Sequence, residues 1–201
     1  MTGVQTCALP IFASGTTKME AAGFTAPMVL PGHYQVVLHV KDQTYSQTLT
    51  CVEDPQNTLY TSEQRKHVYQ KAQELKTLFQ SINTLIDSLN EIQNALKKDS
   101  VTFRKNKTSG SYYKELQKIK SKLMATTQTS IFADEERLRE KVSKLYGAFC
   151  EMESAPNETQ LESIRDLSTE FKTTSNDYRR VQEHYYKTYL QSLKKTERLS
   201  H

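Results

Sequence analysis

Apolar and polar residues alternate along the chain from residue 33 to residue 52. An alternation of period two is typical of a β-strand with one apolar face. Asp42 and Gln43 are expected to form the turn, while Pro31 and Pro55 bound the pattern because proline does not continue a central strand. The sequence therefore predicts a β-hairpin over residues 33–52. Its apolar positions are Tyr34, Val36, Leu38, Val40, Tyr45, Leu49 and Cys51.

The predicted hairpin needs a covering layer, because two strands alone are marginal in water without more strands or a helix over their apolar face. The missing strands are expected to precede the hairpin in a longer protein. Residues 12–55 are therefore interpreted as the truncated remnant of an Ig-like β-sandwich.

After residue 55 the apolar residues recur at intervals of three and four, which is typical of amphipathic helices. The chain has only 6 Gly and 5 Pro to interrupt them. We expect an antiparallel bundle of about four helices over residues 56–201, with two long helices and two shorter ones stacked beside them. The fold class is thus mainly α with a small β part. The helices are predicted at about 62–98, 111–125, 133–152 and 157–196.

Capping residues and apolar seams define these helices. Thr61 or Ser62 is expected to cap the first helix and Asn157 the last. The seam of the last helix turns polar at residues 173–175, which predicts a kink or a gap there. The seam residues are Val68, Ala72, Leu75, Phe79, Ile82, Ile86, Leu89 and Leu96, then Tyr112, Leu116, Ile119 and Leu123, then Leu138, Val142, Leu145, Phe149 and Met152, and finally Leu161, Ile164, Leu167, Phe171, Tyr178, Val181, Tyr185 and Leu193.

The first eleven residues, Met1 to Ile11, read MTGVQTCALPI. This is the translation that a common short-read sequencing adapter gives when its GTG is taken as the start codon. Sequence added by library preparation is left out of fold reasoning. Residues 1–11 are therefore interpreted as an adapter-derived artefact on a metagenomic fragment, and the natural protein is expected to extend upstream.

The distribution of charged and apolar residues argues against nucleic-acid binding and against a membrane span. The formal net charge is +4, and basic residues alternate with acidic ones along every predicted helix. This is typical of solvated helix faces, whereas nucleic-acid modules concentrate basic residues on one face. No stretch approaches the roughly 20 apolar residues that span a bilayer. We expect neither nucleic-acid binding nor a membrane span.

The reactive residue types do not form a catalytic or metal-binding pattern. Cys51 and Cys150 lie far apart and are interpreted as a buried strand residue and a helix-core residue rather than a bridge. The five histidines show no metal-ligand spacing. The acidic residues considered as candidates lie at helix ends or on polar faces, and at a helix start the helix dipole favours them. They are Asp134, Glu135, Glu136, Glu151 and Glu153. We therefore assign no catalytic residue, no metal ligand and no cofactor.

Tyrosines crowd the last predicted helix, and tyrosine enrichment can mark a recognition surface. Tyr178 and Tyr185 share the apolar seam, so core packing explains them. Tyr186 and Tyr189 lie off the seam and are the candidates for a binding surface.

The hairpin region resembles a segment of a known class of secreted proteins. These are glycosyl hydrolase-type proteins with BNR repeats and sialidase-like or sortilin-like β-propellers. In them such a hairpin closes a small β-sandwich behind the propellers, and a helical tail follows. The matching residues are Val29-Leu30-Pro31-Gly32-x-Tyr34-x-Val36-x-Leu38-x-Val40, Tyr45-x-Gln47-x-Leu49 and Asp54-Pro55, with a later similarity from Leu145 to Asn157.

The resemblance implies an exported protein whose propellers and glycosidase carboxylates lie upstream, outside this chain. The chain itself is then a non-catalytic C-terminal accessory region with a structural, spacing or partner-binding role. Its expected partners are the propeller domains of its own parent chain and a further protein. The alternative is a stand-alone coiled-coil-like helical interaction module, whose apolar seams continue into a partner chain.

Overall fold

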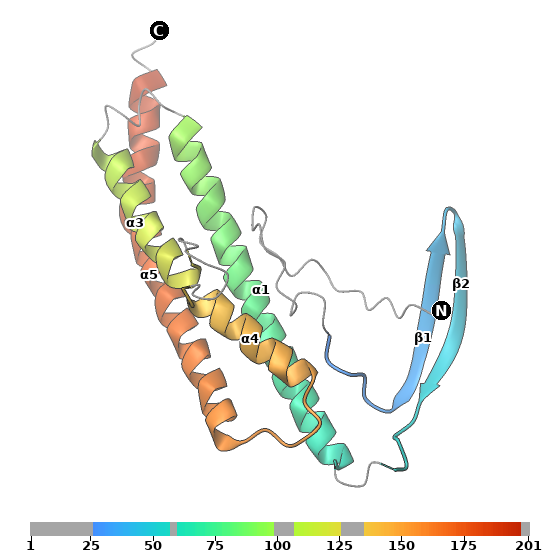
Figure 1. The fold of residues 1–201 in the computed structure, drawn as a ribbon. Coiled ribbons are helices and arrows are strands. Elements are labelled where there is room, and N and C mark those ends of the chain that lie inside the picture. Colours follow the sequence, from blue (N-terminus) through green and yellow to red (C-terminus); the bar gives the residue numbers. More distant parts are fainter. Residues whose placement is uncertain (1–25, 57–59, 99–106, 126–134, 198–201) are drawn as a thin grey trace.

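The structure is a computed structural model that describes residues 26–56, 60–98, 107–125 and 135–197. Two strands precede four helices along these residues (Figure 1). The predicted class, mainly α with a small β part, is thus confirmed. The residues interpreted as adapter-derived lie outside the described part of the chain. The elements are β1 (Gly32–Val40), β2 (Gln43–Cys51), α1 (Ser62–Lys98), α3 (Lys107–Leu123), α4 (Leu138–Cys150) and α5 (Glu158–Glu197).

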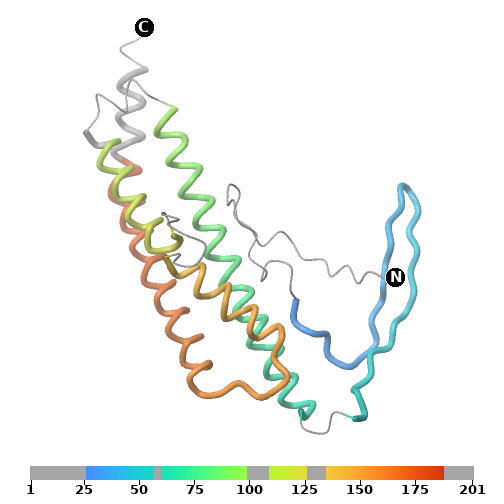
Figure 2. Tube along the Cα trace, in the orientation of Figure 1, coloured from blue at the N-terminus to red at the C-terminus, as the bar shows by residue number. Residues whose placement is uncertain are grey.

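The helices form a bundle of three rods, one of which is broken. The long helices α1 and α5 run in the same direction, and α3 and α4 follow one another in the opposite direction alongside them (Figures 1 and 2). α4 packs mainly on α1, and α3 packs mainly on α5. The expected arrangement, two long helices with two shorter ones stacked beside them, is therefore present.

The hydrophobic core belongs to the bundle alone. Every buried apolar residue in the described part of the chain lies between Tyr60 and Leu167. The predicted seam of α1 is buried throughout, and so are the four predicted seam residues of α3. In α4 the prediction missed Tyr146, which is 1% exposed, and chose its neighbour Leu145, which packs only at the edge of the core.

Reciprocal capping boxes fix the beginnings of both long helices. Thr61 Oγ1 accepts a hydrogen bond from the backbone N–H of Gln64 at 3.2 Å, and Gln64 Oε1 accepts one from Thr61 at 2.9 Å. Asn157 and Gln160 exchange the same pair of bonds at 2.9 Å each. Each box satisfies two backbone donors that a helix start leaves open. Thr61 and Asn157 are thus the caps, as predicted.

The predicted limits of the two short helices are wrong. α3 begins at Lys107 rather than at 111, and the polar Ser109 in its first turn is buried, at 1% exposed. α4 spans Leu138–Cys150 rather than 133–152, and residues 135–137 before it are not helical.

The hairpin turn also differs from the prediction. Val40 pairs with Gln43, so Lys41 and Asp42 form the turn, and Lys41 adopts a φ of 53°. The predicted register and the observed register both keep the apolar residues on one face. The observed one also sets His39 opposite Thr44, where the ring Nδ1 lies 3.0 Å from the hydroxyl. Cross-strand side-chain pairs of this kind stabilise a register.

The hairpin stands apart from the bundle (Figures 1 and 2). In the described part of the chain, neither strand packs on a helix. The segment before β1 approaches the bundle, and Tyr34 donates a 2.5 Å hydrogen bond to the carbonyl of Leu30 in that segment. After β2, Glu53 and Ser62 share a side-chain hydrogen bond at the start of α1.

One buried carboxylate joins the two pieces of the broken rod. Glu140 is 6% exposed, and its Oε2 accepts hydrogen bonds from the backbone N–H groups of Ala125 and Arg137 at 3.2 Å each. Its Oε1 lies 2.8 Å from the Arg139 guanidinium. The residue therefore ties the end of α3 to the beginning of α4.

Replacing Glu140 should loosen this junction. Because Glu140→Ala leaves three donors without their acceptor, the free energy of unfolding should fall by about 2–3 kcal/mol. Urea unfolding followed by circular dichroism measures it. Glu170→Ala is the control: Glu170 pairs with Lys141 at 3.8 Å on the surface, and its loss should change stability by less than about 0.5 kcal/mol. Equal effects of the two variants would contradict the role given to Glu140.

Candidate interaction surface

The hairpin has two chemically different faces. Residues directly opposite one another share a face, and successive residues along a strand alternate between faces. The register sets Tyr34 opposite Leu49 and Leu38 opposite Tyr45. Val36 and Val40, opposite Gln47 and Gln43, complete this apolar face. We call these residues the apolar face: Tyr34, Val36, Leu38, Val40, Gln43, Tyr45, Gln47 and Leu49.

The opposite face satisfies its own polar groups. His33 Nδ1 lies 3.0 Å from Thr50 Oγ1, and Gln35 donates a 2.8 Å hydrogen bond to Ser46. His39 and Thr44 make a similar contact near the turn. Such a face is suited to water. The apolar face has no comparable means of compensation.

The apolar face is open to solvent. Five of the ten large apolar side chains that are exposed in the described part of the chain lie on this face: Val36, Leu38, Val40, Tyr45 and Leu49. Val36, Leu38 and Tyr45 are each more than half exposed. Large contiguous apolar patches on soluble proteins mark interaction sites. This face is therefore the best candidate for a functional surface.

The strand edges also lack the usual protection. Proteins keep edge strands from pairing with other chains by charged residues, prolines or bulges. Neither Gly32–Val40 nor Gln43–Cys51 contains Asp, Glu, Lys, Arg or Pro, and the pairing runs without a bulge. Cys51 is half-buried rather than fully buried as predicted.

Three of the four tyrosines of α5 lie where the sequence predicts: Tyr178 and Tyr185 pack against the core, and Tyr186 is on the surface. Tyr185 stacks on Tyr112 with ring centres 5.5 Å apart, and Gln182 bridges the Tyr112 and Tyr178 hydroxyls at 3.0 and 2.6 Å. These contacts hold α5 to α3. Tyr186 is 48% exposed, which leaves it as a second, isolated surface candidate. The side chain of Tyr189 lies outside the described residues.

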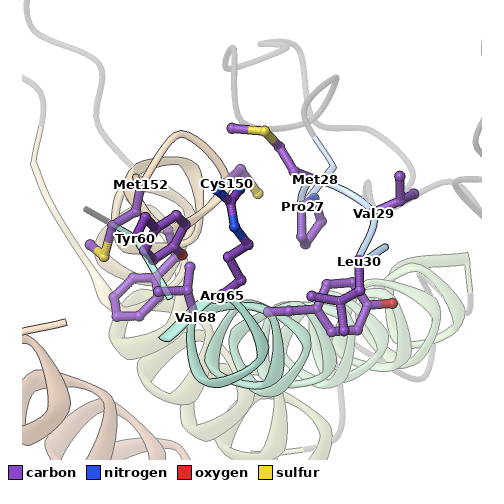
Figure 3. Close-up of a pocket in the computed structure, with 11 residues that line it drawn as sticks. Pro27, Met28, Val29, Leu30, Tyr60, Arg65, Val68, Cys150 and Met152 are labelled. Carbon is purple, nitrogen blue, oxygen red and sulfur yellow. The ribbon is translucent and has the colours of Figure 1, made fainter. Parts of the chain in front are cut away.

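An enclosed cavity lies where the segment before β1 meets the bundle (Figure 3). Its volume is about 40 Å³. This is room for a water molecule or two, whereas pockets for small ligands measure about 300 Å³ or more. Arg65 crosses it with its guanidinium 4.6 Å from the centre of the Tyr60 ring. The cavity is therefore a small packing gap between this segment and the bundle, and it is too small for a substrate.

A larger open groove of about 480 Å³ faces α5 at the break between α3 and α4. It coincides with the polar stretch at 173–175, where the sequence predicts a gap in the seam. Lys122 pairs with Asp177 at 2.9 Å, and Thr174 donates a 2.9 Å hydrogen bond to the Glu170 carbonyl. The groove is lined by Lys122, Glu136, Arg137, Lys141, Asp166, Thr169, Glu170, Thr173 and Thr174.

Cys150 is placed as a core residue. Burial raises the pKa of its thiol, which keeps it protonated, and the thiolate is the reactive form. Burial likewise raises the pKa of the neighbouring Tyr146. Among the residues that the structure describes, no three His, Cys, Asp or Glu side chains gather as metal ligands would. Of the described helices, none combines the length and apolar character of a membrane span.

Comparisons with protein families, curated proteins and solved structures find no match to this chain. The resemblance to the C-terminal segments of BNR-repeat proteins stays a prediction from sequence pattern. Function is therefore inferred from the surfaces of the molecule itself.

The two described cysteines should differ in reactivity. In the folded chain at about pH 8, Cys150 should be alkylated by iodoacetamide at least about tenfold more slowly than Cys51, because it is buried and protonated. Mass spectrometry of quenched digests measures both rates, and the difference should vanish in concentrated urea. Equal rates while the helical circular dichroism signal is intact would contradict the position given to Cys150.

Proposed function

We propose that this chain is a non-catalytic C-terminal accessory region of a larger exported protein of the sialidase-like β-propeller type. The hairpin acts as its docking layer, and the bundle acts as a spacer that carries a partner or holds the propellers at a distance. The observation that carries the proposal is an exposed, uncharged apolar sheet face attached to a helical bundle whose core is already closed.

The hairpin supports docking because neither of its strands packs on a helix of the described chain. Two strands alone are marginal in water. Covering the apolar face would contribute roughly 25 cal/mol for each Å² removed from water. A second β-layer is the natural cover, since stacked sheets pack about 10 Å apart through interdigitated side chains.

The bundle supports a spacing role through its length and its closure. α1 has 37 residues and α5 has 40, so each extends for about 55–60 Å at 1.5 Å per residue. Up to residue 187, where the described side chains of α5 end, the seams of α1 and α5 pack against the core that α3 and α4 complete. A closed rod of this kind separates two points without needing a partner to fold.

The cavities give no support to catalysis by this chain. The enclosed cavity is too small for a substrate, and in the open groove Lys122, Lys141 and Arg137 each face a carboxylate, from Asp177, Glu170 and Glu135. General acid–base chemistry needs a group poised to take or give a proton at the reacting atom. Any glycosidase activity is accordingly placed in the upstream part of the parent protein.

The alternative function, a stand-alone helical interaction module, requires an apolar seam on the outside of the bundle. Among the described side chains of the bundle, Tyr186 is the single exposed large apolar residue. One half-exposed tyrosine is a small anchor compared with the hairpin face. Docking through the hairpin is therefore preferred.

Sequencing the source DNA upstream of the Phe12 codon tests the parentage. The proposal expects an open reading frame that continues upstream into propeller repeats with a secretion signal. An in-frame stop codon immediately before this region, or an unrelated cytosolic domain, would refute it.

Activity assays test the non-catalytic role. The purified chain should release no fluorophore from a panel of 4-methylumbelliferyl glycosides and sialosides above the buffer rate. Glycosidases use two facing carboxylates, whereas Glu136 and Glu170 in the groove each pair with a lysine, Lys144 and Lys141. A commercial sialidase is the positive control. Turnover that disappears on replacing Asp166 or Glu170 in the groove would overturn this reading.

A further inference from the structure

We propose that a second copy of this chain docks on the apolar face, so that two hairpins stack face to face about a two-fold axis at Val36. The inference rests on the proposed function in one respect, that the hairpin is a docking layer. It goes further by naming a partner that the chain itself supplies.

The chemistry of the apolar face selects an uncharged partner. Its polar groups are the amides of Gln43 and Gln47 and the hydroxyls of Tyr34 and Tyr45, and it contains no charged residue. The two hydroxyls donate hydrogen bonds within the chain, to the Leu30 carbonyl and to the Gln43 side chain. A charged peptide, a nucleic acid or an anionic surface would lose hydration there without gaining a counter-charge. Another apolar β-surface loses nothing comparable.

The face is complementary to itself. A two-fold axis perpendicular to the strands, through the row of Val36 and Gln47, turns the second hairpin end for end above the first. The register then sets Tyr34 over Leu38 of the other copy and Tyr45 over Leu49. Val36 meets Val36 and Gln47 meets Gln47, whose amides can hydrogen-bond to each other. Large aromatic and smaller aliphatic side chains thus alternate across the interface, as closely packed sheets require.

Stacking the faces is better than joining the edges. Pairing the free edges of two hairpins would extend the sheet but would leave Val36, Leu38 and Tyr45 in water. Face-to-face packing removes those side chains from water, which is the larger gain because apolar burial dominates association. The two-fold contact is also isologous and therefore closes at two copies.

The area that the two apolar faces can bury sets the expected affinity of the dimer. Five large apolar side chains that are about half exposed, together with the more buried Tyr34, offer on the order of 500 Å² per copy, or roughly 1,000 Å² in total. Specific interfaces begin near this size. The dimer should accordingly be weak, with a dissociation constant of about 1–100 μM.

The test compares two adjacent valines on opposite faces. Val36 and Val37 lie on the same strand and are 52% and 45% exposed. Sedimentation velocity of the full chain from about 1 μM to 1 mM should show a monomer–dimer equilibrium. Val36→Lys should raise the dissociation constant at least about tenfold, because two lysines would meet at the axis. Val37→Lys should change it less than about threefold.

A charge-swap experiment tests the axis directly. Val36→Lys and Val36→Glu chains should each be monomeric alone, and an equimolar mixture should form a heterodimer, since residue 36 of one copy then meets an opposite charge. Helical circular dichroism should be the same for all variants, because the hairpin lies off the bundle. Rescue in the mixture supports the proposal; its absence overturns the two-fold arrangement.

Three other outcomes would overturn the second copy as occupant. The first is a wild-type chain that stays monomeric at 1 mM. The second is a dimer that Val36→Lys leaves unchanged, which places the interface elsewhere, as the helical-module alternative requires. The third is equal loss with both lysine variants, which indicates unspecific association. None of these bears on the upstream coding sequence, so the proposed function is tested independently.

Discussion

A two-stranded sheet has no second layer with which to cover its own apolar face, and this constraint shapes the whole molecule. The helices resolve their apolar seams among themselves, so that all buried apolar side chains in the described chain belong to the bundle region. The hairpin cannot do the same, and Val36, Leu38 and Tyr45 stay more than half exposed. The bundle therefore has a closed core, whereas the hairpin leaves an apolar face in water. Covering that face would gain more free energy than covering any other described surface.

The parts of the fold that the sequence predicts well are those that local chemistry decides. A seam repeated every three or four residues and reciprocal caps at Thr61 and Asn157 specify α1 and α5 almost to the residue. The short helices depend on their neighbours instead. Ser109 is buried in the first turn of α3, and in α4 Tyr146 lies in the core while Leu145 packs only at its edge. Neither contact has a signature in the local sequence.

The sequence predicts that the hairpin has an apolar face, but it does not predict the turn or the register of the strands. Alternation over residues 33–52 predicts an apolar face in need of a cover, and the structure contains that face. The turn at Lys41 and Asp42 was missed because both possible registers keep the face intact; the histidine–threonine pairs on the opposite side distinguish them. The open groove follows from the polar interruption at 173–175, which leaves α5 without apolar side chains where the partner rod is broken.

The separation of the hairpin from the bundle has a functional consequence. Because neither strand packs on a helix in the described chain, changes on the apolar face should alter the proposed docking without altering the bundle core. A docking element gains from such independence, since its surface can be matched to a partner at little cost in the stability of the rest. The hairpin lies beside the bundle and precedes the start of α1 (Figure 1). In the proposed function, a partner on the apolar face would therefore lie alongside the bundle and leave its core unchanged.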